Sequence, residues 1–354
     1  MDFLVIDVVR SSSLKKIGLD VAVIGATGAV GEVFMRVAFE RNFPIRNLRL
    51  LASSRSAGKQ VKYGNEVLTV LETNEEALEG VDLVFCSASS EVSKVWGAWC
   101  REREIIMIDD GSAFRMDEDV PLVIPEVNGN DLDAHNWIIS IPNCTTTPLV
   151  MALNAMQQVS SIKRVTAATY QAVSGTGAAA VQELIDQNSS LSQGSDISTP
   201  EAYPVQIAQN VLPHVDDFGE GGFTKEELKM RNETRKILHD YDLPFAATCV
   251  RVPVLYGHSE VVHVEFASEV SLVDLGNALS LQDGLVFDDD QTNYVTPLEA
   301  ADCDDTFVSR LRFDPSVDNG VVFWCVSDNL RKGAATNAIQ IAESLLQRGI
   351  LSES

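Results

Sequence analysis

The stretch Asp20-Val21-Ala22-Val23-Ile24-Gly25-Ala26-Thr27-Gly28-Ala29-Val30-Gly31 decides the fold of the amino-terminal half of this 354-residue chain. Residues 20–24 predict a short buried strand, and the glycines predict a tight turn. The apolar positions between Val33 and Ala38 recur at helical spacing and predict a helix. A GxxGxxG pattern between a strand and a helix is the dinucleotide-binding fingerprint, because glycines let the backbone approach a pyrophosphate.

Strand-like and helix-like segments continue to alternate after this turn, which predicts a doubly wound parallel sheet. The further strands are expected at Leu48–Leu51, Val81–Cys86, Ile105–Ile108 and Ile138–Ile141, with a helix at Val92–Arg101.

The pattern changes after residue 144. Here we expect strands at Val165–Val173, Cys249–Leu255 and His263–Ser268, a charged helix at 224–240, and a long helix at Asn329–Leu351. Residues 186–222 are rich in Ser, Gln, Asn, Gly and Pro and predict a long excursion, as a lid or a subunit contact.

The composition is that of a globular protein, with 45% hydrophobic and 22% charged residues, and the length predicts two domains. A formal net charge of −24 argues against binding nucleic acid or an anionic membrane, so any phosphate site must be built locally. No apolar run is long enough for a membrane span. Residues 1–18 are too short and too acidic for a signal peptide and are interpreted as an extension of unknown role.

The six cysteines are scattered, with no CxxC pair and no His/Cys cluster of metal spacing. This distribution predicts a cytoplasmic protein without a disulfide framework or a metal site.

The turn after the second strand predicts which dinucleotide binds. NAD-binding folds place an acidic residue there for the ribose 2′-hydroxyl. This chain has Ser53, Ser54, Arg55 and Ser56 instead. Hydroxyls and a guanidinium suit a 2′-phosphate, so the cofactor is predicted to be NADP.

Cys144 lies in the segment 140–148 (SIPNCTTTP), where an apolar run ends and a helical run begins. The positive end of a helix dipole lowers a thiol pKa, so this position favours a nucleophilic thiolate. Such a thiol needs a base. Of the five histidines, His258 follows Gly257 at the end of an apolar run, whereas His135, His214 and His239 have polar neighbours and His263 falls inside a strand pattern. A core cysteine and a structural histidine are the alternative readings of these two residues.

Eight motifs in order make residues 19–350 resemble the aspartate-semialdehyde dehydrogenase family. They are GATGAVGE (25–32), SRSAG (54–58), SAFRMDEDVPLVIPEVN (112–128), PNCTT (142–146), YQAVSGTG (170–177), TKEELKMRNETRKIL (224–238), RVPVLYGHSE (251–260) and DNLRKGAATNAIQIAE (328–343).

The resemblance implies a Rossmann-type domain at 19–143, completed by the C-terminal helix at 329–354, and an α+β catalytic and dimerisation domain at 144–328. It implies reversible, NADPH-dependent reductive dephosphorylation of L-4-aspartyl phosphate to L-aspartate 4-semialdehyde through a cysteine thioester. That reaction serves the biosynthesis of lysine through diaminopimelate, and of methionine, threonine and isoleucine. A homodimer or homotetramer is expected.

The resemblance also implies a role for each matching residue. Cys144 is the nucleophile, His258 the acid/base, and Gln171 orients the substrate. Arg251 would bind the substrate carboxylate, and Arg115 and Lys229 would bind phosphate. The expected NADP contacts are Gly25, Thr27, Gly28, Ala29, Val30, Ser53, Ser54, Arg55, Ser56, Ser174, Gly175 and Asn329.

Three departures from the family pattern lie near these motifs. Asp110-Gly111 stands where Asn-Ser is usual, Ser89-Ser90 where a glycine pair is common, and Ile141 where Asn often precedes PNC. The related N-acetyl-γ-glutamyl-phosphate reductase is the alternative enzyme, because it shares the thiol chemistry and the cofactor. A non-catalytic cofactor-binding homologue and a Cys–His hydrolase are the alternatives of other classes.

Overall fold

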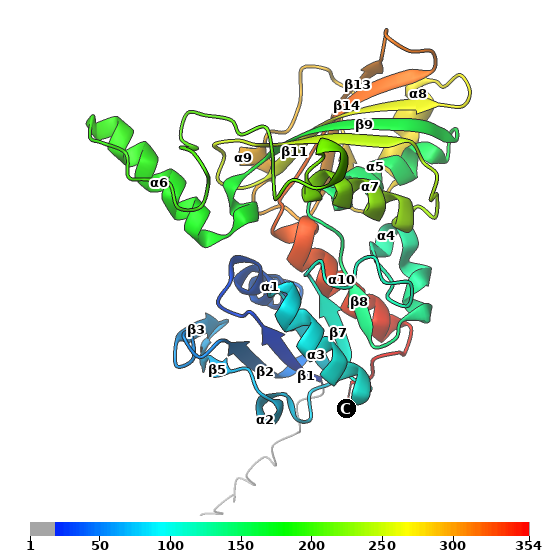
Figure 1. Ribbon diagram of the computed structural model, residues 1–354. Helices are drawn as coiled ribbons and strands as arrows, with labels where there is room; N and C mark the ends of the chain where they lie inside the picture. Colours follow the sequence, from blue (N-terminus) through cyan, green and yellow to red (C-terminus); the bar gives the residue numbers. More distant parts are fainter. Residues whose placement is uncertain (1–17, 354) are drawn as a thin grey trace, which may run out of the picture.

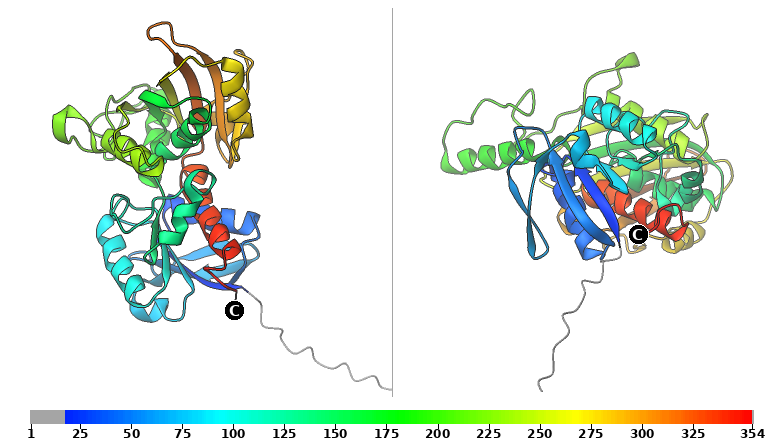
Figure 2. Two further views of the ribbon diagram at one scale, coloured as in Figure 1. Left: turned by 90° about the vertical axis from the view of Figure 1, so that its right-hand side faces the viewer. Right: turned by 90° about the horizontal axis from the view of Figure 1, so that it is seen from below.

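A computed structural model describes residues 18–353, and the expected extension at 1–18 lies outside the described residues except for Gly18. The chain forms two lobes, each built on a six-stranded sheet (Figures 1 and 2). No helix among the described residues is long and apolar enough to cross a membrane.

The first sheet has the strand order β5-β2-β1-β6-β7-β8, and every neighbouring pair in it is parallel. Its strands are β1 (Leu19–Ile24), β2 (Ile45–Ala52), β5 (Leu71–Glu72), β6 (Leu83–Cys86), β7 (Ile106–Asp109) and β8 (Ile138–Ser140). The doubly wound parallel sheet predicted from the sequence is therefore confirmed. A small hairpin, β3 (Gln60–Tyr63) and β4 (Glu66–Thr69), was not predicted.

Helices cover this sheet because their apolar faces pack on its buried strands. They are α1 (Ala29–Glu40), α2 (Glu75–Leu78), α3 (Ser90–Glu102) and α10 (Thr336–Gln347). A short α4 (Pro125–Asn128) instead contacts α10 and α5, and its Val127 packs against the core of the second lobe. The rings of Phe34 in α1 and Phe85 in β6 stack with centroids 4.0 Å apart. The C-terminal α10 returns to this lobe (Figure 1), and its apolar residues share a core with those of α1.

The second sheet is mixed, with the order β10-β9-β11-β14-β13-β12. Its strands are β9 (Ile162–Gln171), β10 (Phe245–Arg251), β11 (His258–Phe266), β12 (Leu285–Phe287), β13 (Thr306–Phe313) and β14 (Gly320–Ser327). Apolar residues of α5 (Thr146–Gln157), α7 (Lys225–Ile237) and α8 (Leu272–Leu281) pack with the inward residues of these strands in one core. A short α9 (Pro297–Ala300) lies beside β14.

Several predicted boundaries in this lobe are wrong. The strand expected at Cys249–Leu255 ends at Arg251, where Pro253 follows without an N–H for the ladder. The strand expected at 263–268 begins already at His258, because the β9 and β14 ladders extend to that end. The predicted long C-terminal helix opens with a π-helical segment at Arg331–Ala335 before α10.

The predicted excursion at 186–222 is also only partly irregular. Its first residues complete α6 (Ala178–Gln193), which projects from the body of the molecule in Figure 1. Ala180 and Leu184 bury one side of this helix against residues 207–212, which explains why a polar sequence remains helical. Residues 194–219 then form no helix or strand beyond isolated bridges.

Candidate active site

The candidate site lies where the carboxyl edge of the first sheet meets one edge of the second. The glycine turn follows β1, Asp110 follows β7 and Cys144 follows β8, so parallel strands deliver all three to one edge. In the second sheet, Gln171 ends β9, Arg251 ends β10 and His258 begins the antiparallel β11.

A cavity of about 440 Å³ joins the two edges. Its lining includes six of the residues predicted to bind the cofactor, the predicted nucleophile, and one residue predicted to bind phosphate. The lining residues are Gly28, Ala29, Val30, Ser87, Ala88, Asp110, Arg115, Asn143, Cys144, Ser174, Gly175, Thr176, Gly177, Asn329, Leu330, Gly333 and Ala334.

Cys144 occupies the turn two residues before α5, and its neighbours hold it there. Asn143 Oδ1 accepts hydrogen bonds from the Thr145 backbone N–H (3.0 Å) and hydroxyl. Gly333, from the π-helical segment, packs directly against the cysteine: a Cβ at that position would lie 2.9 Å from Cys144 Cβ. The backbone of residue 333 therefore forms one wall of the space that holds Cys144.

The pKa of the Cys144 thiol does not follow the prediction of a lowered value. Burial raises it to about 12, the charge of Glu226 adds to the rise, and Arg251 and Arg115 oppose it. The pKa rise from loss of hydration therefore outweighs the lowering expected from the helix N-terminus, and Cys144 is protonated as a thiol.

His258 is buried and held in one tautomer. Its Nδ1 accepts the Ala172 backbone N–H at 3.0 Å, so the neutral ring carries its hydrogen on Nε2. Burial, together with the nearby Arg251 guanidinium, lowers the pKa of His258 well below its ordinary value. Nε2 has no hydrogen-bond partner among residues 18–353. The Nε2–H group of His258 is therefore a hydrogen-bond donor that the described residues leave unused.

Gly175 connects this histidine to the cavity. A Cβ at position 175 would lie 3.0 Å from His258 Nε2 and 3.1 Å from Arg251 Nη1. Because Gly175 also lines the cavity, the imidazole and the guanidinium stand directly behind its wall. Arg251 is buried, and its Nη1 donates to the Ala172 carbonyl at 2.6 Å.

Gln171 and Lys229 converge on a carboxylate that the sequence prediction did not assign to the site. Glu226 Oε1 accepts Gln171 Nε2 at 3.0 Å, and Oε2 accepts Lys229 Nζ at 3.2 Å. Lys229 also binds Asp216 at 2.7 Å and does not line the cavity. Its link to the site is through Glu226.

Arg115 is buried at the cavity wall. Its Nη1 donates to Glu233 at 3.0 Å and its Nη2 to the Asp110 carbonyl at 2.7 Å. Its Nε has no partner among the residues that the structure describes. A guanidinium with an unused buried donor beside a thiol suits an oxyanion of the substrate.

The glycine turn fits a dinucleotide phosphate. Gly25 has a φ of +85°, and a Cβ there would lie 2.0 Å from the Ser87 carbonyl oxygen. Gly28 caps α1 without a side chain, so the first N–H groups of this helix face the cavity. Thr27 lines the neighbouring cavity described below.

Asn329 and Ser174 close the other side. Asn329 Oδ1 accepts the Ser174 hydroxyl (3.1 Å) and the Gly257 N–H (3.0 Å). Asn329 Nδ2 is buried and unpaired within the described part of the chain. This orphaned amide donor and the α1 N-terminus give the cavity wall unpaired N–H groups, which suit a polar ligand.

Ser53, Ser54, Arg55 and Ser56 form the turn after β2, beside the glycine turn. The Gly25 N–H donates to the Leu51 carbonyl at 2.9 Å, which ties the two turns together. Ser53, Ser54 and Arg55 are exposed. These polar groups are therefore available at the sheet edge, outside the cavity.

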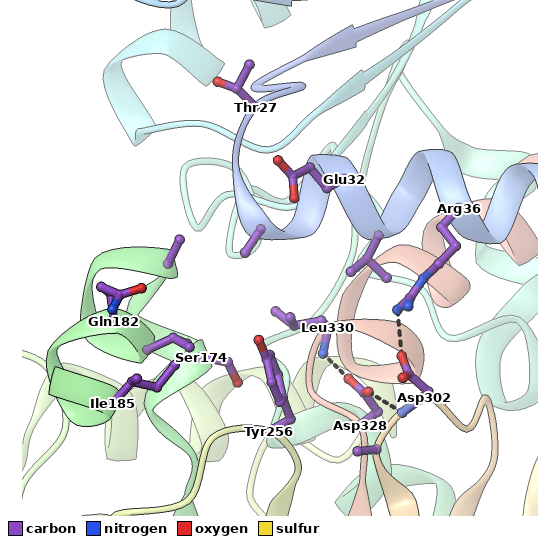
Figure 3. Close-up of a pocket in the computed structure, with 15 residues that line it drawn as sticks. Thr27, Glu32, Arg36, Ser174, Gln182, Ile185, Tyr256, Asp302, Asp328 and Leu330 are labelled. Carbon is purple, nitrogen blue, oxygen red and sulfur yellow. Dashed lines mark hydrogen bonds and ion pairs between the residues drawn. The ribbon is translucent and has the colours of Figure 1, made fainter. Parts of the chain in front are cut away.

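A second cavity of about 660 Å³ adjoins the first and shares Ala29, Ser174 and Leu330 with it. Figure 3 shows Thr27 and Glu32 on one side and Gln182 and Ile185 of α6 on the other. An Arg36–Asp302 ion pair of 2.7 Å bridges the lobes at its border.

The departures from the family pattern lie close to these walls. Asp110 lines the cavity, and its carboxylate accepts the Ser87 hydroxyl at 2.8 Å. Ser89 caps α3, and Ser90 begins it. Ile141 is buried in the first core, where a polar side chain is not needed.

The charged helix expected at 224–240 is present as α7, but the burial of its charged side chains was not predicted. A charged helix is by default expected to present a solvated face, yet Glu226, Glu227 and Glu233 of α7 are buried. Glu226, Lys229, Glu233 and Lys236 recur at helical spacing on one face, and this spacing was the signal that could have indicated an inward charged stripe.

No group of three or more His, Cys, Asp or Glu within residues 18–353 could hold a metal ion. The six cysteines are free thiols.

Known proteins resemble the chain along nearly its whole length. A family model described as "Semialdehyde dehydrogenase, NAD binding domain" matches residues 20–135, and one described as "Semialdehyde dehydrogenase, dimerisation domain" matches residues 153–332. The aspartate-semialdehyde dehydrogenase of Aquifex aeolicus is 45% identical over 94% of this chain and all of its own length.

Two solved structures extend the comparison. Aspartate semialdehyde dehydrogenase II from Vibrio cholerae, described as complexed with ASA, has a TM-score of 0.90 and 40% identity over 93% of this chain and 98% of its own. The enzyme from Candida albicans, described as with NADP, has a TM-score of 0.73 and 25% identity over 94% of this chain and 99% of its own.

Proposed function

The chain belongs to the aspartate-semialdehyde dehydrogenase family of oxidoreductases, and we propose that its cavity carries out that reaction with Cys144 as the nucleophile. In the reductive direction, the Cys144 sulfur attacks the acyl carbon of aspartyl phosphate, phosphate leaves, and a thioester forms. NADPH, when bound, supplies the hydride that reduces the thioester to the aldehyde level. Aspartate semialdehyde then departs and the thiol is restored.

His258 serves as the proton-exchanging group. In its resting tautomer, Nε2 donates a hydrogen bond to the substrate oxygen that becomes negative during attack. To accept a proton at Nε2 the ring must instead carry one on Nδ1, which breaks the contact with the Ala172 N–H. The acid and base forms of His258 therefore differ in this backbone contact.

Four charged side chains and one amide bind the substrate. Arg251 takes the α-carboxylate, since a buried guanidinium suits a planar carboxylate. Arg115 takes the phosphate, beside the thiol, with Lys229 assisting through its contact with Glu226. Gln171 orients the substrate, and Glu226, buried among these groups, takes the α-ammonium.

The cofactor is NADP. The N-terminus of α1 receives the pyrophosphate, and Ser53 to Ser56 receive the 2′-phosphate. Asn329 Nδ2 and the Ser174-Gly175 pair are available to the nicotinamide end.

One observation carries the proposal: a single cavity is lined by the α1 N-terminus, Cys144 and Arg115. The dinucleotide site, the nucleophile and the phosphate site are thus adjacent. A Cys–His hydrolase would not need the first of these.

The buried carboxylate of Glu226 favours an aspartyl substrate over an N-acetylglutamyl one. A free ammonium can pair with it, whereas an N-acetyl group carries no charge. The full-length relatives named above agree with this choice.

The test is a purified-enzyme assay of phosphate-dependent NADP reduction with both semialdehydes and both nicotinamide cofactors. We expect activity with aspartate semialdehyde and NADP, and its loss in Cys144→Ser. Cys303→Ser is the control, because Cys303 is the other partly exposed thiol and lies outside the cavity. Near-normal activity of Cys144→Ser would refute the mechanism.

The uncovered face of the second sheet is proposed as the dimer contact. The helices α5, α7 and α8 share a core with its inward residues, while Tyr170, Val261 and Trp324 lie on the other face. Tyr170 is 39% exposed, and its ring lies 6.0 Å from that of Trp324. A match to a dimerisation domain supports a second copy of the chain as the occupant.

Tyr170→Asp should therefore shift the sedimenting species toward the monomer. Tyr241→Asp is the control, because Tyr241 is 67% exposed on the turn after α7. Sedimentation will also distinguish a dimer from a tetramer. The free thiols further support a cytoplasmic location, since an oxidising compartment would pair them.

A further inference from the structure

The inward face of α7 carries a stripe of alternating charge. Glu226, Lys229, Glu233 and Lys236 are spaced by three, four and three residues, so they lie on one face of the helix. The acidic and basic members of this stripe contact different parts of the first lobe and of the site.

Glu233 is the most deeply buried member of the stripe, with 1% of its surface exposed. Its Oε1 accepts Arg115 Nη1 at 3.0 Å, and its Oε2 accepts the Asn143 backbone N–H at 2.7 Å. One carboxylate thus holds the guanidinium at the cavity wall and the residue before the nucleophile. A charge-assisted hydrogen bond fixes its donor more tightly than a neutral one does.

Lys236 supports the same arrangement from the next turn. Its Nζ donates to the carbonyls of Arg115 (2.8 Å), Asp117 (2.7 Å) and Val120 (2.8 Å). The backbone that carries Arg115 is therefore held by Lys236, and its side chain by Glu233. Lys236 thus joins three carbonyls of the loop 115–120 to α7.

We propose that Glu233 is a positioning residue that sets the Arg115 guanidinium and the Asn143-Cys144 backbone in register with each other. The inference rests on the proposed phosphate role of Arg115. With Nη1 committed to Glu233 and Nη2 to the Asp110 carbonyl, the guanidinium plane is fixed and its unpaired Nε is left for the ligand. Phosphate and thiol then meet at a defined separation.

A simple charge effect predicts the opposite result. A buried carboxylate close to an anion site repels phosphate, so neutralising Glu233 would strengthen phosphate binding if charge alone mattered. Positioning predicts weaker binding, because glutamine presents an N–H₂ to one of two donors and cannot satisfy both. The sign of the change separates the two explanations.

The experiment measures the phosphate KM of the full-length enzyme with aspartate semialdehyde and NADP for Glu233→Gln and Glu233→Asp. Both variants should raise the phosphate KM about tenfold or more, while the NADP KM stays within about twofold. Aspartate keeps the charge but is too short to bridge both donors. If Glu233→Gln does not fold, Glu233→Asp decides the question.

Glu227→Gln is the matched control. Glu227 is a buried carboxylate of the same helix that accepts the Cys249 and Thr224 N–H groups and touches neither Arg115 nor Asn143. It should lower the melting temperature without changing the phosphate KM. An unchanged or lower phosphate KM in the Glu233 variants would overturn the inference.

Arg115→Ala distinguishes this failure from failure of the proposed function. If Arg115→Ala leaves the phosphate KM unchanged, Arg115 does not bind phosphate. The proposed role of Arg115 and the positioning role of Glu233 are then both wrong. If Arg115→Ala raises it and the Glu233 variants do not, only the role of Glu233 is wrong.

Discussion

Asn143, the residue before Cys144, donates a hydrogen bond from its side-chain amide to Glu226 Oε1 at 3.0 Å. The same oxygen accepts Gln171, so the cysteine turn and the end of β9 meet on one carboxylate. Glu226 therefore belongs to the immediate surroundings of Cys144, and its charge acts on the thiol.

Neutralising Glu226 should make Cys144 react at lower pH. Burial raises the pKa of this thiol to about 12, and Glu226 is the strongest charge adding to the rise. In Glu226→Gln the alkylation rate with iodoacetamide, followed from about pH 7 to pH 10, should shift toward lower pH. Glu227→Gln should leave the profile of Cys144 unchanged, and an identical profile in Glu226→Gln would contradict the assignment.

Gly333→Ala should displace Cys144, the proposed nucleophile. A Cβ at position 333 would lie 2.9 Å from Cys144 Cβ and 3.2 Å from its carbonyl oxygen, so the cysteine turn must move. We expect kcat to fall about tenfold to a hundredfold, because displacements of about 1 Å have effects of that size. Gly129→Ala serves as the control, since the nearest atom to its Cβ would be 3.8 Å away. Full activity in Gly333→Ala would show that the turn tolerates the shift.

Arg55→Ala should weaken the preference for NADP. Arg55 is exposed in the turn after β2, next to Ser54 and Ser56, where it can reach a 2′-phosphate. The KM for NADP should rise about tenfold while the KM for NAD changes little, so the two cofactors control for each other. Equal changes for both would mean that Arg55 does not read the phosphate.

The stabilising effect of Asp109→Asn, relative to the wild type, should be larger at pH 8 than at pH 4. Burial raises the pKa of Asp109 to about 6, although its Oδ1 accepts the Ser93 hydroxyl at 2.7 Å. The pKa of Asp109 is higher in the folded protein than in the unfolded chain. The carboxyl of Asp109 therefore makes its full contribution to the stability of the wild type below about pH 4, and this contribution is lost as the pH rises through about 6.

Asparagine keeps the acceptor and does not titrate, so the variant should be more stable than the wild type by about 2–3 kcal/mol at pH 8. Thermal unfolding of both proteins at the two pH values measures this difference. A difference that does not depend on pH would argue against a buried, titrating Asp109.

The local sequence was sufficient to predict those elements whose formation depends on neighbouring residues alone. The strand, glycine turn and helix at 19–40 were predicted because hydrophobic periodicity and a glycine turn act within a dozen residues. The position of Cys144 before α5 followed from the Pro-Asn turn in the same way. Motif order then indicated the family, which the full-length relatives confirm.

Only the tertiary structure decided which charges are buried. Glu226 and Glu233 lie on a helix whose composition predicts a solvated surface, and they are buried because Gln171, Asn143 and Arg115 are brought to them from other segments. The pKa of the Cys144 thiol is raised and not lowered for the same reason, because desolvation depends on every segment that packs around Cys144. Sequence by itself determined the family and predicted the reacting groups, whereas the charge states and spacing of these groups are set by contacts between distant residues, which local patterns do not encode.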